Sequence, residues 1–364
     1  MPGPFSLPSR AQRLDARDVA LQLSGAASLY TRLASPQVAT ILCYHSVAPD
    51  ELAGFVDPRW RLSPAQFEQH VDYLSRQRHV ISLSELVDTL RAKGEFRPGT
   101  VAIVFDDGYL DNLTCAAPIL ARYGLPATLF LATGHVQRGE AQFIDRLHAY
   151  WTRRTGERVR FPGLDADLRD PQQRARCYRE LNLRLIEADK DQRDDMLTSL
   201  ALQLGVPREL PTRLTLNWDE VRELVRRYPQ VELGVHSMNH LDLVTHQHRA
   251  ERELAGSRDM IAAETGVTVQ HHSFPFGRST PWLRAKVRQL GFASSCADRE
   301  TTWVERGADP YWLGRVYPTP SLRLLQSRTS GVASGLRRLL LGVRGWPERR
   351  RRWSAGPTRL SGLR

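Results

Sequence analysis

A run of apolar residues that ends in two acids constrains the fold of this chain more than any other stretch. Residues 101–105 are Val, Ala, Ile, Val and Phe, a pattern typical of a strand buried on both faces of a parallel sheet. Asp106 and Asp107 follow at once, and Gly108 permits a sharp turn after them. Because α/β folds carry their chemistry at the carboxyl ends of such strands, both acids are candidate site residues. Taken alone, Asp-Asp-Gly would indicate only a turn.

A second apolar run ends in two histidines. Residues 231–235 again have the pattern of a strand, and His236 and His240 come after it. A spacing of four predicts that both imidazoles lie on one face of a helical turn. Two carboxylates at one strand end and two imidazoles at another predict a metal site with its own general base. The alternative for this pair is two surface histidines without a ligand.

These two stretches resemble the first two signature motifs of the NodB-type polysaccharide deacetylases, carbohydrate esterase family four. The motifs are Phe105-Asp106-Asp107-Gly108 and the segment from His236 to His240. The resemblance implies an α/β fold, a distorted and incomplete (β/α) barrel, and a metal-dependent hydrolase. The expected reaction removes an N-acetyl or N-formyl group from an amino sugar. Further motif matches support it, at residues 42–47, 123–130, 216–221 and 274–277.

The resemblance also implies a role for each residue of the site. Asp106 would be the general base, and Asp107, His236 and His240 would hold a divalent ion. Zinc is the expected ion, because imidazole and carboxylate ligands at an open site suit it. Successive residues that leave a strand point in opposite directions, so only one of the two acids can face the metal squarely. The backbone N–H of Phe276 would stabilise the oxyanion.

Two departures from the family pattern leave parts of the mechanism open. Ser273 stands where many relatives carry an arginine that holds the catalytic Asp. Many relatives also use a late histidine as the general acid, but no histidine follows Cys296 here. His45 is therefore the candidate acid, with a structural histidine as the alternative. We expect Arg315, whose pKa above about 12 excludes it as an acid, to bind substrate or a carboxylate. Tyr109 is the other expected substrate contact.

The pattern of elements divides the chain into three parts. Residues 1–37 form an N-terminal extension, residues 38–320 the catalytic domain and residues 321–364 a basic tail. Strands and helices alternate in the catalytic domain, which indicates a parallel, barrel-like sheet. Residues 138–213 break this alternation, with helical stretches dense in both signs of charge and no strand of comparable quality. We expect a helical insertion beside the site.

The basic character of the chain is confined to its tail. The net charge is +11, and residues 321–364 hold eleven arginines and one acid, Glu348, so this segment accounts for +10 and the rest for +1. A nearly neutral catalytic domain makes nucleic acid an unlikely partner. Arginines interleaved with leucine and tryptophan predict contact with an anionic membrane surface. A solvated basic tail is the alternative.

Cysteine usage and the N-terminus predict the compartment. The four cysteines lie far apart without a Cys-x-x-Cys pair, which favours reduced thiols (Cys43, Cys115, Cys177 and Cys296). Acids interrupt the one stretch that resembles a signal peptide. We therefore expect a cytoplasmic protein at the inner face of the cell membrane. Its expected substrate is an amino-sugar glycan or a lipid-linked precursor. Because of the two departures, a catalytically degenerate barrel that only binds carbohydrate is the alternative function.

Overall fold

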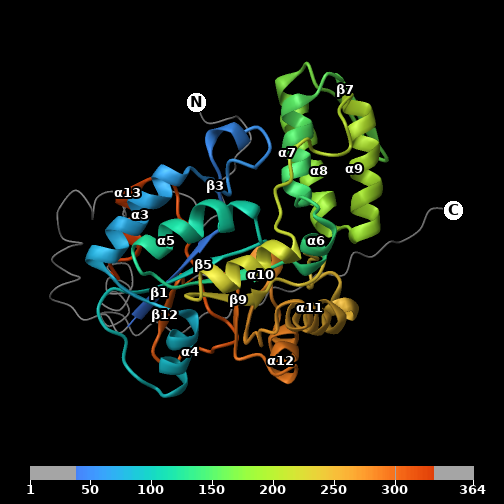
Figure 1. The fold of residues 1–364 in the computed structure, drawn as a ribbon. Helices are drawn as coiled ribbons and strands as arrows, with labels where there is room; N and C mark the ends of the chain where they lie inside the picture. Colours follow the sequence, from blue (N-terminus) through green and yellow to red (C-terminus); the bar gives the residue numbers. More distant parts are fainter. Residues whose placement is uncertain (1–37, 300, 332–364) are drawn as a thin grey trace, which may run out of the picture.

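The structure is a computed structural model that describes residues 38–299 and 301–331. The predicted N-terminal extension, residues 1–37, and residues 332–364 of the predicted tail lie outside this part (Figure 1). The first residues assigned to the tail belong instead to the barrel. They form α13 (Leu322–Arg328), which buries Leu325 in the main core. Within the described ranges, no helix is long and apolar enough to cross a membrane.

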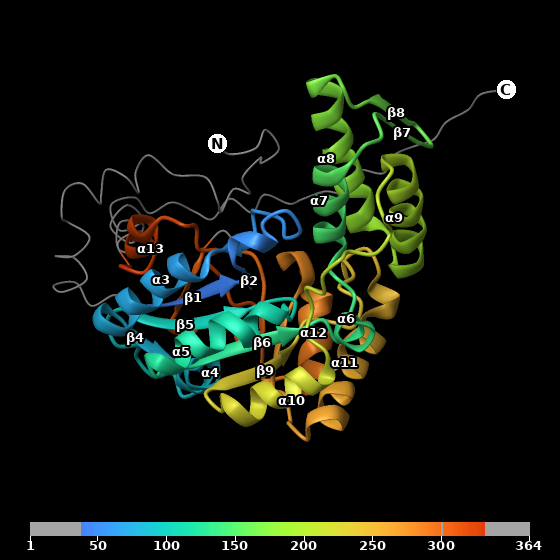
Figure 2. The same ribbon diagram turned by 45° about the horizontal axis from the view of Figure 1, so that its top comes forward.

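A curled, mainly parallel sheet forms the centre of the molecule (Figure 2). Its strands follow the order β11-β10-β9-β6-β5-β1-β12, and β4 also pairs with β5. Only β12 runs antiparallel to its neighbour β1 among these described strands. The predicted incomplete (β/α) barrel is therefore confirmed. The strands are β1 (Val38–Tyr44), β4 (His79–Ile81), β5 (Thr100–Phe105), β6 (Ala127–Leu131), β9 (Val231–Val235), β10 (His271–Ser273), β11 (Ser294–Cys296) and β12 (Trp303–Glu305).

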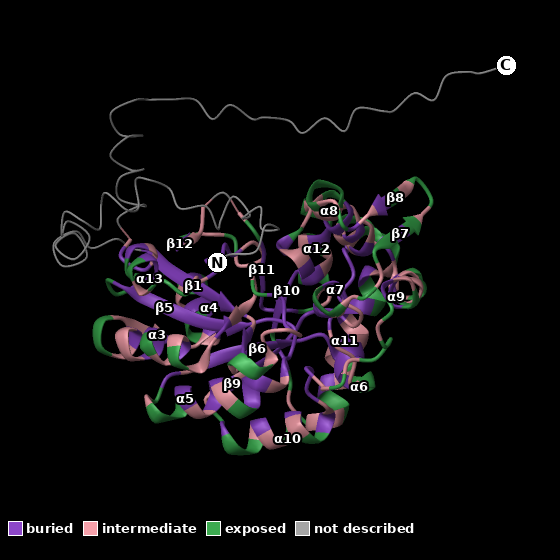
Figure 3. Cartoon of the chain, turned by 90° about the horizontal axis from the view of Figure 1, so that it is seen from above, coloured by how far each residue is buried: buried purple, intermediate pink, exposed green. Residues whose placement is uncertain are grey.

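Helices pack around the sheet and bury its strands (Figure 3). The first of them begins with a capping box, in which the Ser63 hydroxyl accepts from the Gln66 N–H while the Gln66 side chain accepts from the Ser63 N–H. Pro64 then occupies the first helical position, where its missing N–H costs nothing. The covering helices are α3 (Pro64–Gln77), α4 (Leu83–Arg91), α5 (Ala117–Arg122), α6 (Thr133–Arg138), α10 (Trp218–Arg227), α11 (Ala250–Thr265) and α12 (Pro281–Gln289).

Strand β5 occupies the middle of the sheet, as its unbroken apolar run predicts. All six of its residues are buried, and it pairs with β1 on one side and with β4 and β6 on the other. Its carboxyl end therefore opens at the centre of the barrel mouth. The acids that follow it, Asp106 and Asp107, lie where the ends of β1, β6 and β9 also meet.

A short segment closes the gap between the two ends of the curled sheet. Leu313 forms a parallel bridge with Cys296 of β11, and Val316 forms one with Leu42 of β1. Backbone hydrogen bonds from Val316 N to Ile41 O and from Cys43 N to Val316 O, both 2.8 Å, fix this segment against β1. Arg315 lies within it. The closure therefore carries a buried arginine into the interior of the barrel.

The insertion stands beside the barrel as a bundle of three helices with its own core (Figure 1). The helices are α7 (Phe143–Arg153), α8 (Pro171–Glu187) and α9 (Lys190–Leu204). The insertion also contains two short strands, β7 (Arg158–Phe161) and β8 (Leu164–Asp167), which form an antiparallel hairpin. Gly163 supplies the positive φ of 70° that its tight turn requires, and only Val159 and Ala166 are buried. Such short, charged strands lack the apolar pattern that identifies the barrel strands.

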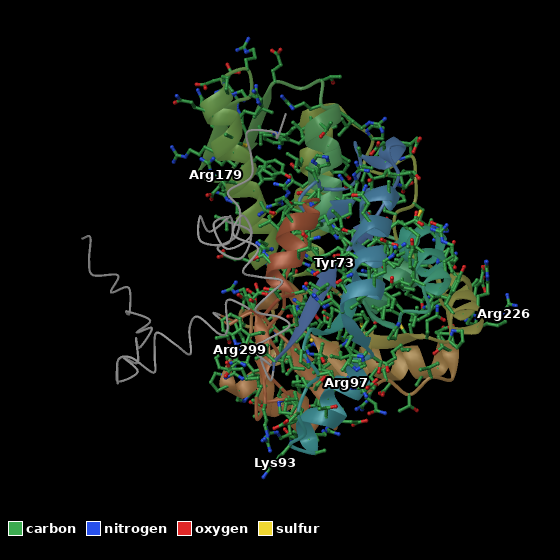
Figure 4. The ribbon with its side chains drawn as sticks, turned by 90° about the vertical axis from the view of Figure 1, so that its left-hand side faces the viewer. Tyr73, Lys93, Arg97, Arg179, Arg226 and Arg299 are labelled. Carbon is green, nitrogen blue, oxygen red and sulfur yellow. The ribbon has the colours of Figure 1, made fainter. Side chains whose placement is uncertain are left out.

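Exposed cations occur on both the barrel and the insertion. Figure 4 shows Arg179 on the insertion, Arg226 at the end of α10 and Lys93 after α4 at separate points of the surface. This distribution agrees with the nearly neutral charge of the first 320 residues.

Candidate active site and metal centre

The two acids after β5 diverge because the backbone turns left-handed between them. Asp107 has a φ of 78° and Gly108 a φ of 79°. Positive φ is uncommon for a residue with a side chain and marks a locally strained backbone. As a result, the carboxylate of Asp106 faces Arg315 while that of Asp107 faces His236 and His240. The expectation that only one of the two acids can face a metal squarely stays a prediction.

The two histidines after β9 come together in an irregular loop. The prediction that they lie on a helical turn is wrong, because residues 236–240 are not helical and both Ser237 and His240 have positive φ, of 62° and 49°. The rings of His236 and His240 nevertheless lie 4.9 Å apart. Their Nε2 atoms lie 3.4 and 3.2 Å from one carboxylate oxygen of Asp107.

The chemistry of these three side chains fits a divalent cation. The Nδ1 of His236 lies 2.9 Å from the Ser273 carbonyl, which can only accept, so Nδ1 carries the proton and Nε2 offers its lone pair to the centre. Asp107 Oδ1 is buried and receives no hydrogen bond of good geometry from the described residues. The three candidate ligand atoms lie within 4.8 Å of one another. A cation bound there would satisfy the orphaned oxygen.

Arg315 holds Asp106 inside the barrel. Its Nη1 donates to Asp106 Oδ2 at 2.5 Å and to the Ser273 hydroxyl at 2.7 Å, and that hydroxyl lies 3.3 Å from the same carboxylate oxygen. Burial alone would raise the pKa of Asp106, but Arg315, His236 and His45 outweigh it and lower the pKa to about 2. Asp106 is therefore ionised, and its Oδ1 has no hydrogen-bond partner among the described residues.

This contact resolves the question raised by Ser273. Position 273 holds a serine and supplies no guanidinium. The guanidinium that contacts Asp106 belongs to Arg315, which follows Asp106 by 209 positions in the chain. Of the two expected roles for Arg315, the contacts of its guanidinium support the binding of a carboxylate. The side chain is 2 % exposed, and its other terminal nitrogen donates to the Tyr317 hydroxyl at 2.9 Å.

Tyr109 does not lie where a substrate contact is expected. Its side chain is buried away from the cavity that holds the two acids, among Ala48, Val56 and Leu214. Its hydroxyl donates to Asp145 Oδ2 at 2.7 Å. The structure therefore contradicts the prediction that Tyr109 binds substrate. The tyrosine instead connects the barrel to the insertion.

His45 and Phe276 both line the cavity, as expected of site residues. His45 stacks on Trp60 with ring centroids 4.6 Å apart, and a nitrogen of its ring lies within 4.8 Å of the Asp106 carboxylate. Burial lowers the pKa of His45 although Asp107 and Asp106 oppose it. Phe276 has a φ of 58°, and its ring packs edge-on against His240 at 4.6 Å. Their roles as acid and oxyanion donor stay predictions.

The histidine loop is held from two sides. From the barrel, the buried Glu253 of α11 accepts from the N–H groups of Met238 and Asn239 at 2.9 and 2.7 Å. From the insertion, Arg193 of α9 donates to the carbonyls of Asn239 and His240 at 3.1 and 2.9 Å. The insertion therefore helps to position a candidate metal ligand.

A cavity of about 220 Å³ contains the whole site. The barrel contributes the acids, the histidines and an aromatic group formed by His45, Trp60 and Tyr317. The insertion contributes lining residues that are uncharged and mostly apolar (Gln142, Phe143, Ile144, Asn182 and Ile186). The cavity is thus formed between two regions of the chain.

Several residues of this site escape sequence reasoning. Arg193 stands in a helix rich in charge, and nothing in that pattern marks one arginine as buried. Gln142 and Asn182 belong to no motif. A signal did exist for Arg315, since an arginine flanked closely by the buried Leu313 and Val316 indicates a charge inside a core.

Comparisons with known proteins identify the family. The family profile described as "Polysaccharide deacetylase" matches residues 93–295, which is more than half of the chain. A Bacillus subtilis protein named for the same family, YxkH, is 30% identical over 106 residues, covering 29% of this chain and 35% of that protein. The poly-β-1,6-N-acetyl-D-glucosamine N-deacetylase of Staphylococcus aureus is 38% identical over 85 residues, covering 23% and 28%. The matched regions thus span about a third of the relatives' length.

Solved structures support the same fold. The deacetylase PplD of Streptococcus pyogenes has a TM-score of 0.54 at 17% identity, and the match covers 81% of this chain and 99% of that one. IcaB from Ammonifex degensii has a TM-score of 0.53 at 18% identity, covering 80% and 97%. At these identities the likeness shows the fold alone. Together with the profile match, the motifs and the barrel lead to one conclusion: this chain belongs to the polysaccharide deacetylase family.

Proposed function

We propose that this protein is a metal-dependent N-deacetylase that acts on an N-acylated amino sugar of a glycan or of a lipid-linked glycan precursor. One observation carries the proposal. An ionised Asp106, held by Arg315, lies 3.8 Å from the Nε2 of His236, beside the group formed by Asp107, His236 and His240. A base next to a candidate metal site is what amide hydrolysis needs.

Asp107, His236 and His240 would hold the ion, which we propose to be zinc because nitrogen and carboxylate ligands suit it. The ion would supply Lewis-acid activation of the acyl carbonyl and of the attacking water. The Ser273 carbonyl fixes the tautomer of His236, and Glu253 and Arg193 fix the loop that carries His240.

The protein's own groups would then handle the protons. Asp106 Oδ1, which has no partner among the described residues, would accept the proton of the attacking water. Arg315 keeps Asp106 ionised before that step. The water oxygen bonds to the acyl carbon, and the carbon–nitrogen bond breaks. The leaving nitrogen gains the proton that Asp106 took from the water, which His45 would pass on, since its ring nitrogen lies within 4.8 Å of the Asp106 carboxylate. The products are a carboxylate and a free amine.

The tether of Asp106 also weighs against a degenerate, purely binding barrel. Arg315 binds one carboxylate oxygen of Asp106, and the other oxygen has no partner among the described residues. This arrangement fits a general base in an active enzyme better than a carboxylate in an inactive barrel. The named activity of the Staphylococcus aureus relative, removal of acetyl groups from poly-β-1,6-N-acetyl-D-glucosamine, supports an N-acetylated amino sugar as substrate.

The test is release of acetate from β-1,6-linked N-acetylglucosamine oligomers by the full-length chain. We expect release that stops when the metal is removed by a chelator and returns when zinc is restored. Absence of acetate release after loading with zinc, cobalt or nickel in turn would contradict the proposal.

A further inference from the structure

One polar side chain of the insertion is buried in the cavity with nothing to bind. Gln142 is 2 % exposed and lines the cavity, and neither its Oε1 nor its Nε2 has a hydrogen-bond partner among the described residues. An amide buried without partners costs about 1–3 kcal/mol for each group left unsatisfied. Buried polar groups of this kind find their partners in ordered water or in a bound ligand.

The backbone of Gln142 has a structural task, but its side chain does not share it. Gln142 is the N-cap of α7, and its carbonyl accepts from the N–H groups of Asp145 and Arg146 at 3.0 and 3.1 Å. An N-cap side chain ordinarily accepts from the first turn of its helix, which favours Ser, Thr, Asp or Asn at this position. The Gln142 side chain makes no such bond. Helix capping therefore does not explain this side chain.

Its surroundings place Gln142 next to the reacting centre. The following residue, Phe143, packs against both His240 and Phe276, with ring centroids 6.3 and 6.0 Å apart. Asn182 of α8 lines the same cavity, and its Oδ1 is also buried without a partner among the described residues. The insertion thus presents a donor and two acceptors, all uncharged, to the cavity.

Another part of the cavity lining is aromatic. Trp60 stacks on His45 at 4.6 Å and meets Tyr317 edge-on at 5.7 Å. The cationic neighbour Arg59 is already paired with Asp57 at 2.7 Å. The volume of about 220 Å³ is several times the roughly 30 Å³ that one water occupies in the liquid. A neutral ligand with hydroxyl groups on its edge and an apolar face matches these walls, and a pyranose ring has this form.

We propose that Gln142 and Asn182 form a sugar-binding subsite on the insertion, in which their amides hydrogen-bond the hydroxyl groups of a neutral pyranose packed against the Trp60 side of the cavity. This inference rests on the proposed function for the identity of the sugar. It assigns to the insertion the recognition of substrate, whereas the barrel holds the groups proposed for the chemistry.

The experiment replaces the amide by an apolar side chain of the same length. Affinity for a tetramer of β-1,6-linked N-acetylglucosamine is measured by calorimetry on the zinc-loaded full-length chain, with Asp106→Asn in every sample to suppress turnover. Gln142→Met should weaken binding about tenfold, since two hydrogen bonds to the ligand are lost. Its melting temperature should stay equal or rise, because the change removes two unsatisfied buried groups. Gln270→Met, at an exposed glutamine, is the matched control and should change neither value.

Asn182→Leu provides the second variant and should weaken binding by a smaller factor. Unchanged affinity in both variants would overturn the proposal. It would also be overturned if the protein with Asp106→Asn as its single substitution bound no tetramer. A lower melting temperature for Gln142→Met would also overturn it, because the amide would then have its partners within the protein. Acetate release by the wild type is measured separately. Binding without release would contradict the proposed function and leave this subsite standing.

Discussion

The barrel and the insertion line one cavity in different ways. The barrel places ionisable groups at the ends of buried strands and holds them with buried partners, as with Asp106 and Arg315. The insertion presents uncharged side chains, two of which have polar atoms without partners among the described residues. The difference suggests that chemistry depends on the barrel and recognition on the insertion. Arg193 is the exception, because it reaches from α9 to the loop that carries His240.

The largest effect should come from the barrel wall. His236→Ala removes one of three candidate ligands, so the zinc content should fall from about one ion per chain to near zero. Acetate release should fall by about a thousandfold or more. Metal analysis of the purified protein, with circular dichroism as a check of folding, measures the first effect. A variant that keeps its full complement of zinc would show that the centre lies elsewhere.

Loss of the partner of Asp106 should affect stability as well as activity. Arg315→Met leaves the Asp106 carboxylate buried without its guanidinium, which typically costs about 3–5 kcal/mol. Unfolding in urea should show this loss, while Arg226→Met, at an exposed arginine of α10, should leave the midpoint in place. Equal stability of the two variants would mean that the buried pair does not hold the barrel mouth.

Arg193→Met tests the contact through which the insertion reaches the loop of His240. The loop of His240 should become less well positioned, so zinc affinity should fall about ten- to a hundredfold, the usual range for partners of metal ligands. Competition with a chelator measures that affinity. Arg179→Met, on the exposed face of α8, should bind zinc as the wild type does (Figure 4). Unchanged affinity in Arg193→Met would confine the metal centre to the barrel.

The smallest effect concerns two buried carboxyls, one in each region. Burial raises the pKa of Asp111 to about 6, although hydrogen bonds from Ser46 and Val47 oppose it. The pKa of Asp111 is thus higher in the folded chain than in the unfolded chain, where it is about 4. Because ionisation then favours the unfolded chain, the free energy of unfolding should fall as the pH rises from about 4 to 6. Asp111→Asn should remove that decline from the curve of melting temperature against pH.

Asp145 of the insertion should change the dependence of stability on pH in the same direction. Burial raises its pKa well above the ordinary range, although it accepts from Asp57 N and the Tyr109 hydroxyl. Asp145→Asn should therefore remove a decline in stability that begins at about pH 4, the ordinary pKa of the carboxyl in the unfolded chain. Curves for the two variants that run parallel to the wild type would contradict both assignments.

The parts of this account that the sequence predicts depend on short-range patterns. The strands β5 and β9 follow from continuous apolar runs, and the acids and histidines after them follow directly. The conformation of the histidine loop was mispredicted, because the positive φ of Ser237 and His240 is imposed by contacts with distant elements such as Glu253. A spacing of four residues cannot distinguish that loop from a helical turn.

Contacts between distant segments account for the rest. Arg315 reaches Asp106 because a segment at the end of the barrel closes the sheet, and Tyr109 turns away from the cavity because Asp145 of the insertion binds its hydroxyl. Neither contact produces a periodic pattern of apolar residues from which it could be predicted. The role of Gln142 is likewise visible only from its burial and from the absence of partners among the described residues.

The central claim is that Asp106 acts as the base beside a metal held by the barrel. Asp106→Asn keeps the shape of the side chain and leaves Asp107, His236 and His240 intact, but an amide cannot accept the proton of the attacking water. The decisive measurement is acetate release by this variant, with its zinc content determined on the same sample. We expect about one zinc per chain and a rate at least about a hundredfold below that of the wild type. A zinc-loaded variant whose rate stays within a few-fold of the wild type would contradict the account.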